Sequence, residues 1–169
     1  DQATALAVAE LRDGSVTGDA EGSLAQLRDM FVYHKAVADS RGLELVMYEG
    51  GTHIVGVGAW QNDEELADFF TYLNYTPEMG VLYTELLGIW DEVGGTLFNA
   101  FTAVGRASKF GSWGQLRHLD DTNPRMDAIT DFLNADSGPI EIGTPAIQGN
   151  TAQHETLVAD LSDLDGIYQ

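Results

Sequence analysis

The sequence contains no cysteine among its 169 residues. This absence excludes a disulfide framework and any metal site that uses cysteine ligands. It leaves the redox compartment open, because a secreted protein can also fold without disulfides.

Basic residues are scarce, with 8 lysines and arginines against 27 acidic residues and a net charge of −19. Such a surface repels phosphate backbones and anionic lipid headgroups, so we expect neither a nucleic acid nor a membrane partner. High acidity favours a salty, extracellular or periplasmic setting. No apolar run approaches the roughly 20 residues that a membrane helix needs, and the start lacks the basic region of a signal peptide. We therefore expect any export signal to lie outside this chain.

The remaining composition, with 44% apolar residues, is enough for one sizeable core. Apolar periodicity and capping residues predict a series of helices and strands along the chain. Helices are expected over 23–41, with Ser23 and Gln26 as capping pair, from Asn62 to 73, over 77–93 after Thr76, and from Pro124 after Asn123; strands are expected over 43–48 and 96–104.

This order predicts a right-handed crossover between parallel strands, and therefore an α/β fold. Two clear strands are too few to close a barrel or to cover all these helices. We therefore expect residues 1–169 to be a portion of one (β/α) barrel domain that needs a further segment to close, with a possible tail outside the barrel from about residue 138.

Polar and aromatic side chains follow both predicted strands. The first strand leads into Tyr48-Glu49-Gly50-Gly51-Thr52-His53, and the second leads through Asn99 and Phe101 into the glycine-punctuated loop 105–114. In barrels and open α/β sheets the reactive groups lie just beyond the carboxyl ends of the strands. A carboxylate with an aromatic platform suits a sugar site.

Glycosidic cleavage passes through an oxocarbenium-like state, which one carboxylate stabilises while a second carboxyl group protonates the leaving oxygen. Glu49 is the candidate for the first role, and Trp113 would stack on the apolar face of a pyranose. Both residues also have ordinary interpretations, Glu49 as a solvated or ion-paired residue at a strand end and Trp113 as a core residue.

Three stretches carry a family resemblance: 42–51, which ends in Tyr48-Glu49-Gly50-Gly51; Pro77-Glu78-Met79-Gly80-Val81-Leu82-Tyr83; and Ser108-Lys109-Phe110-Gly111-Ser112-Trp113-Gly114. Over roughly residues 20 to 135 the chain resembles bacterial cellulose-binding and glycosidase-like proteins, which are similar to the clan of retaining (β/α)8 (TIM barrel) glycoside hydrolases. The resemblance implies that Glu49 is the nucleophile ending the seventh strand and that Trp113 follows the eighth.

The chain departs from that clan in one respect. The resemblance implies an acid/base glutamate directly after an asparagine at the end of the fourth strand, and no Asn-Glu dipeptide occurs in the sequence. The fourth strand would lie upstream of Asp1. The expected partner is therefore the N-terminal remainder of the same barrel, possibly as a separate chain.

Other kinds of site are disfavoured, and we expect no metal and no cofactor. The histidines are scattered and lack the spacing that places two zinc ligands on one helix face. Gly56 and Gly58 lack the third glycine of a dinucleotide loop, because Gln61 stands there. Ser112 lacks the preceding glycine of a nucleophile elbow, because Phe110 stands there. The four histidines are His34, His53, His118 and His154. The aspartates Asp160, Asp163 and Asp165 form only part of a calcium loop.

Two functions remain. In the first, the chain belongs to a retaining glycoside hydrolase acting on a β-linked polysaccharide, with Glu49 as nucleophile and a set of residues that orient the sugar. That set is Tyr48, His53, Asn99, Ser112 and Trp113. In the second, the same scaffold binds a cellulose-like glycan without cleaving it, through Trp113, Trp60 and Tyr83 as stacking platforms. A second carboxyl group about 5 to 5.5 Å from Glu49 would distinguish them.

Overall fold

A computed structural model describes residues 1–136 of the chain. The tail predicted from about residue 138, His154 and the aspartates Asp160, Asp163 and Asp165 lie outside the described residues. Within the described part, no helix is long and apolar enough to cross a membrane.

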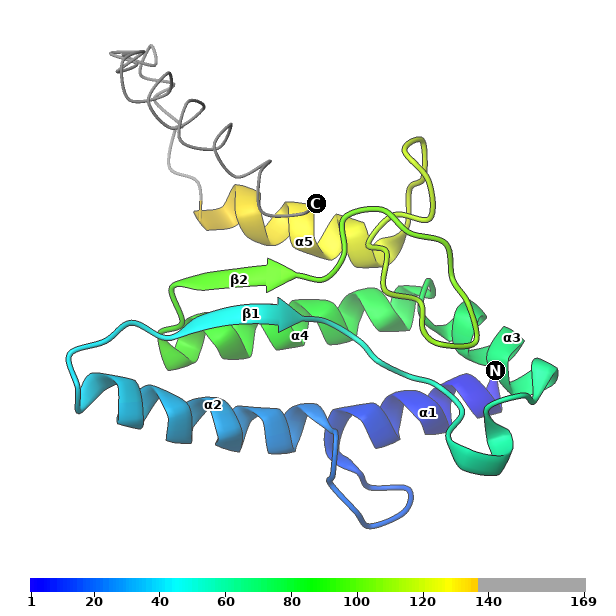
Figure 1. Cartoon of the computed structure of the whole chain (residues 1–169), viewed down its shortest axis with the longest axis horizontal. Helices are drawn as coiled ribbons and strands as arrows, with labels where there is room; N and C mark the ends of the chain where they lie inside the picture. The colour runs from blue at the N-terminus through cyan, green and yellow to red at the C-terminus, as the bar shows by residue number, and fades with distance from the viewer. Residues whose placement is uncertain (137–169) are drawn as a thin grey trace, which may run out of the picture. The chain divides into compact units, whose positions relative to one another are not determined.

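Helices and strands follow one another in nearly the predicted order (Figure 1). The elements are α1 (Gln2–Asp13), α2 (Leu24–Asp39), β1 (Val46–Gly50), the short 3-10 helix η1 (Gly58–Trp60), α3 (Glu64–Leu73), α4 (Pro77–Val93), β2 (Leu97–Ala100) and α5 (Pro124–Asp136).

Three predicted capping residues form hydrogen bonds at the N-termini of their helices. The Ser23 hydroxyl accepts from the Gln26 amide of α2, and the Thr76 hydroxyl accepts from the Met79 amide of α4. The Asn123 side chain accepts from the amides of Arg125 and Met126 at the start of α5. Each cap satisfies amides that have no partner inside their helix, which fixes where the helix begins.

Four elements differ from the prediction. Helix α1 was missed, although Asp1 caps it and Gly14 ends it with φ 71°. Helix α3 begins after Asp63 rather than at Asn62, because the Asp63 carboxylate accepts from the Leu66 amide at 3.0 Å. The first strand lies over 46–50 instead of 43–48, and the second ends at Ala100 instead of residue 104. Glu49 therefore lies within β1, at its carboxyl end.

The two strands form a parallel sheet, as the crossover predicted. Val46 pairs with Leu97 and Met47 with Phe98, and an irregularity follows before Gly50 pairs with Ala100. The chain between them runs through α3 and α4, so both carboxyl ends point the same way (Figure 1).

Within residues 1–136, one face of this sheet is packed and the other is open. Met47 and Phe98 pack with Phe31 of α2 and Trp90 of α4, whose ring meets the Phe98 ring at 5.8 Å. On the opposite face, Val46 is 53% exposed, Tyr48 80% and Leu97 58%. Parallel sheets are ordinarily covered on both faces. The open face is therefore an unusual surface for a parallel sheet.

Helix α4 forms the centre of the apolar core. Two clusters meet along it, one with α1, α3 and α5 and the other with α2 and the sheet. Its buried apolar residues are Met79, Leu82, Tyr83, Leu86, Leu87 and Trp90. The core therefore packs against one face of the sheet.

Candidate functional site

Glu49 and Trp113 line the same open cavity, of about 330 Å³, beyond the carboxyl ends of β1 and β2. The expectation that they share one end of a parallel sheet is confirmed. The lining residues come from the chain after β1 and the chain after β2: Glu49, Gly50, Gly51, Thr52, His53, Phe101 and Trp113.

The aromatic side chains of the cavity contact one another. The Trp113 ring lies 5.5 Å from the His53 ring and 5.8 Å from the Phe101 ring, centre to centre, with tilted geometry in both pairs. Trp113 remains 38% exposed. These contacts hold the indole in place and still leave part of it accessible to a ligand.

Glu49 is exposed, and within residues 1–136 no group forms a hydrogen bond or ion pair with its carboxylate. A carboxylate without a partner at the mouth of a cavity can attack an electrophile or stabilise a cation. Among the described residues that line this cavity, it is also the only carboxylate.

The glycines after β2 shape the loop that carries Trp113, as its glycine neighbours in the sequence suggest. Gly111 has φ 140°, and a side chain there would collide with the Trp113 indole. Gly114 packs directly against the backbone of Gly105. Backbone hydrogen bonds join the strand exit to the loop, from Thr102 N–H to Trp113 O at 2.8 Å and from Gln115 N–H to Thr102 O at 2.8 Å. The loop is thus a fixed part of the site.

Two predicted sugar contacts lie outside the cavity, on the open face of the sheet. Tyr48 and Asn99 are exposed there, and the Asn99 amide donates to the Tyr48 carbonyl at 2.8 Å. Neither side chain lines the cavity around Glu49.

Two predicted contacts are wrong because the side chains are buried. Ser112 is 3% exposed, and its carbonyl accepts from Arg125. Tyr83, named as a stacking platform, is 1% exposed, and its hydroxyl accepts from the Thr52 amide at 3.2 Å. It lies on the inward stripe of α4, which explains its burial. Trp60 is 62% exposed but does not line the cavity.

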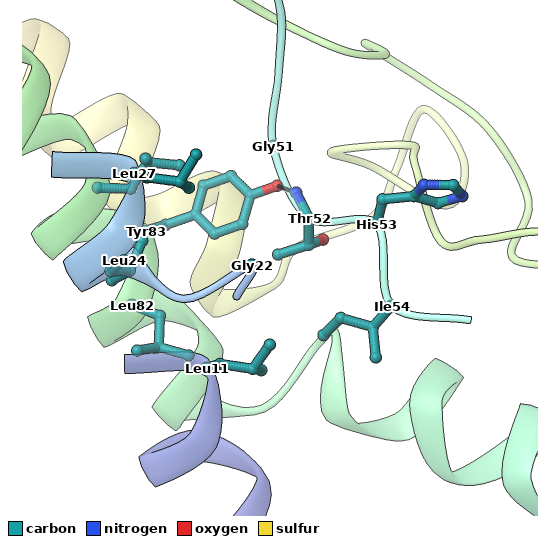
Figure 2. Close-up of a pocket in the computed structure, with 11 residues that line it drawn as sticks. Leu11, Gly22, Leu24, Leu27, Gly51, Thr52, His53, Ile54, Leu82 and Tyr83 are labelled. Atoms are coloured by element: carbon teal, nitrogen blue, oxygen red, sulfur yellow. Dashed lines mark hydrogen bonds between the residues drawn. The ribbon is translucent and has the colours of Figure 1, made fainter. Parts of the chain in front are cut away.

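A second cavity, of about 110 Å³, shares Gly51, Thr52 and His53 with the first. Figure 2 shows the residues that line this second cavity. Leucines from α1, α2 and α4 line the second cavity, and the Tyr83 ring reaches across it toward Thr52. His53 points away from these leucines, toward the loop that carries Trp113 (Figure 2). The second cavity is mostly apolar and offers packing space rather than chemistry.

Sequence reasoning missed the residues behind the site. Arg125 is fully buried, with 0% exposure, and it donates to the carbonyls of Ser112 and Gly114 on either side of Trp113. The Asn123 amide donates to the Gln115 carbonyl at 2.9 Å. The motif Asn123-Pro124-Arg125 predicts a helix start, but nothing in it indicates a buried arginine.

Two ionisable groups near the start of α5 have pKa values shifted from their usual ones. The Arg117 guanidinium and its backbone amide hold the pKa of the Asp121 carboxyl far below its usual value. Burial raises the pKa of the Tyr75 phenol, and the nearby cations of Arg125 and Arg117 oppose that rise. Within residues 1–136, no three or more His, Asp or Glu side chains are grouped as they would be around a metal ion.

No protein-family model, curated protein or solved structure matches the chain. The resemblance built on Tyr48-Glu49-Gly50-Gly51 and Trp113-Gly114 therefore stays a prediction. The geometry and chemistry of the cavity carry the functional proposal.

Proposed function

We propose that this chain is the C-terminal part of a (β/α)8 barrel and belongs to a retaining glycoside hydrolase that acts on a β-linked polysaccharide. The observation that carries the proposal is the shared cavity of Glu49 and Trp113 at the carboxyl ends of two parallel strands. This edge is where barrel enzymes place their reactive groups.

Glu49 is the proposed nucleophile. Its oxygen forms a bond to the anomeric carbon as the glycosidic bond breaks, and the leaving oxygen takes a proton from a second carboxyl group. Water then cleaves the glycosyl ester and restores the carboxylate. The absence of an ion-pair partner for Glu49 among residues 1–136 supports this role, because the carboxylate is available to attack.

Trp113 is the proposed sugar platform. Its partly exposed indole borders the same cavity as Glu49, so a pyranose stacked on it would lie near the carboxylate. The apolar face of a sugar ring and an aromatic ring bury apolar surface against each other, with a small number of polar groups setting orientation. His53 is the proposed polar contact.

The acid/base group must come from a further segment in this proposal. Within residues 1–136, Glu49 is the only carboxylate that lines the cavity, whereas retaining chemistry needs a second about 5 to 5.5 Å away. Further strands would pair with the free edges of β1 and β2 to complete a barrel, and their inward side chains would then cover the open face with Val46, Tyr48 and Leu97. Barrel strands are covered on both faces.

The second candidate is a glycan-binding protein without hydrolase activity. The single carboxylate of the cavity favours this candidate, since Trp113 alone can bind a sugar but one carboxylate does not complete the retaining mechanism. We expect an extracellular or periplasmic location for either function, because −19 net charge suits contact with neutral glycans in a salty medium.

The test is hydrolysis of a panel of aryl β-glycosides by the protein as the cell makes it, followed by proton NMR of the first product. We expect retention at the anomeric carbon. Glu49→Gln should lower kcat by several orders of magnitude and leave oligosaccharide affinity nearly unchanged, because it removes the nucleophile and keeps the shape. Glu44→Gln, an exposed change before β1, is the matched control.

Each outcome decides between the candidates. Full activity of Glu49→Gln eliminates this residue as nucleophile, and inversion eliminates the retaining mechanism. If no glycoside is cleaved while a polysaccharide still binds through Trp113, the binding function is correct.

A further inference from the structure

Arg125, the second residue of α5, is a fully buried cation with neutral partners. One terminal nitrogen donates to the Thr52 hydroxyl at 3.3 Å, the Asn74 side-chain oxygen at 3.1 Å and the Ser112 carbonyl at 2.8 Å. The other donates to the Gly114 carbonyl. Within residues 1–136, no carboxylate forms an ion pair with it.

Two aromatic rings also face this guanidinium. Its central carbon lies 4.8 Å from the centre of the Tyr75 ring and 5.4 Å from that of Tyr83. A buried cation without a counterion is costly, and ring faces offset part of the cost through their quadrupoles. The Tyr75 hydroxyl donates to Gly114 O at 3.1 Å, so the ring and the arginine act on the same carbonyl.

The partners of Arg125 belong to the segments that form the candidate site. Thr52 lies between Glu49 and His53 along the chain, directly after β1, and the two carbonyls flank Trp113 after β2. One side chain therefore joins the carboxylate side of the cavity to the tryptophan side. Asn74, at the end of α3, braces the same point and accepts from Thr52 at 2.6 Å.

We propose that Arg125 is the positioning residue of this site and holds the Trp113 indole in the cavity that Glu49 also lines. It does not line the cavity itself, and it acts through the backbone carbonyls on both sides of Trp113. The sugar-binding consequence rests on the proposed function, whereas the effect on the indole does not.

The chemistry explains why arginine occupies this position. A planar guanidinium presents several donors in a fixed fork and can serve the Ser112 and Gly114 carbonyls at once, while the lysine ammonium is a compact point charge. Arg125→Lys should therefore keep some of the hydrogen bonds to the loop that carries Trp113 and lose the others. Arg125→Met keeps much of the volume and removes every donor.

The first test uses the full chain labelled with 5-fluorotryptophan and fluorine NMR, well below the unfolding temperature. The chain has 3 tryptophans, and the resonance of Trp113 is identified by its loss in Trp113→Phe. We expect Arg125→Met to move the Trp113 resonance toward that of the free amino acid, and Arg125→Lys to move it less. The resonance of Trp90, which is 3% exposed in the other cluster, should stay in place.

The matched control is Arg12→Met. It removes a bidentate pair with Glu85, between α1 and α4, and contacts no part of the site. An unmoved Trp113 resonance in folded Arg125→Met overturns the proposal, and so does movement of all three tryptophans together, which indicates a general loss of structure. If Arg125→Met does not fold, the Arg125→Lys spectrum decides by the same criteria.

The second test measures binding of cellohexaose by calorimetry. We expect Arg125→Met to weaken binding at least about fivefold, within the range that loss of an aromatic platform produces, and Arg125→Lys to restore part of it. If the unmodified protein binds no β-glucan or other glycan, the proposed function fails while the NMR result still decides the role of Arg125. If glycan binds with unchanged affinity to an Arg125→Met protein whose Trp113 resonance has moved, Arg125 does not position this site for sugar.

Discussion

Trp113 is the single side chain whose removal tests the sugar platform most directly. Trp113→Ala should weaken oligosaccharide binding by roughly 1 to 3 kcal/mol, because it removes the ring on which a pyranose would stack. Isothermal titration with cellohexaose and laminarihexaose measures the change. Trp60→Ala is the matched control, since Trp60 is 62% exposed and does not line the cavity. Equal losses in both variants would contradict the assignment of the platform.

Asp121 links the acidity of one carboxyl group to the stability of the same region. Its carboxylate is nearly buried and accepts from the Arg117 backbone and side chain at 2.8 Å and from Asn123 at 3.2 Å. These donors lower its pKa in the folded state. The stabilisation is therefore fully present above the unfolded pKa near 3.8 and is lost as pH falls through the lower folded value.

We therefore expect Asp121→Asn to destabilise the protein at pH 7 by about 1.5 kcal/mol, near the lower end for charged hydrogen bonds because Arg117 is half-exposed. The difference between this variant and the unmodified protein should narrow as pH is lowered below about 4. The midpoints of urea unfolding of both proteins, taken from pH 7 to 3, measure this difference in stability. Asp131→Asn, an exposed change on α5, is the control and should change the free energy of unfolding only slightly at pH 7. If the stability difference between Asp121→Asn and the unmodified protein does not change with pH, the charge of Asp121 is not the cause of the destabilisation.

At the scale of elements, the close crossing of α4 and α5 sets where the first turn of α5 and Arg125 lie. A methyl group at Gly80 of α4 would stand 2.7 Å from the Pro124 carbonyl oxygen and 2.8 Å from its ring. Gly80→Ala should therefore destabilise the protein by roughly 1 to 3 kcal/mol through overpacking. Gly88 lies on the same helix and faces open space, so Gly88→Ala should stabilise by about 0.5 to 1 kcal/mol. Thermal unfolding of both variants checks the opposite signs, and matching signs would contradict the packing argument.

Local signals predicted the elements well where the interaction that fixes them is local. Ser23, Thr76 and Asn123 each bind an amide two or three residues away, so sequence alone identifies them as caps. The site required longer connections. The hydrogen bond from Arg125 to Thr52 joins residues that are 73 positions apart in the sequence. The neighbouring residues Asn123 and Pro124 predict only a helix start.

The same limit explains the other differences. Tyr83 could have been recognised as a core residue from the apolar stripe of α4, which also holds Met79 and Leu86. The burial of Ser112 had no comparable signal, because it depends on α5 packing behind the loop. Glu49 and Trp113 were placed together because parallel strands joined by a crossover share their carboxyl ends, which is a rule of topology rather than of side chains.

At the scale of the whole molecule, the open sheet face is the feature that the proposed barrel must explain. Within residues 1–136 the sheet has two parallel strands, and Val46, Tyr48 and Leu97 expose apolar surface beside a packed core. In the proposed complete barrel, inward-facing side chains of further strands cover these residues.

Leu97 tests this proposal in the protein as the cell makes it. Leu97 is 58% exposed on the open face, and Leu119 is 83% exposed in the segment before α5. If further strands cover the sheet, Leu97→Asp places an unpaired charge inside a barrel and should destabilise the protein by several kcal/mol. Leu119→Asp should change stability by no more than about 0.5 kcal/mol, as surface substitutions do. Urea unfolding measures both, and equal tolerance of the two aspartates would show that this face remains in water and that no barrel closes over it.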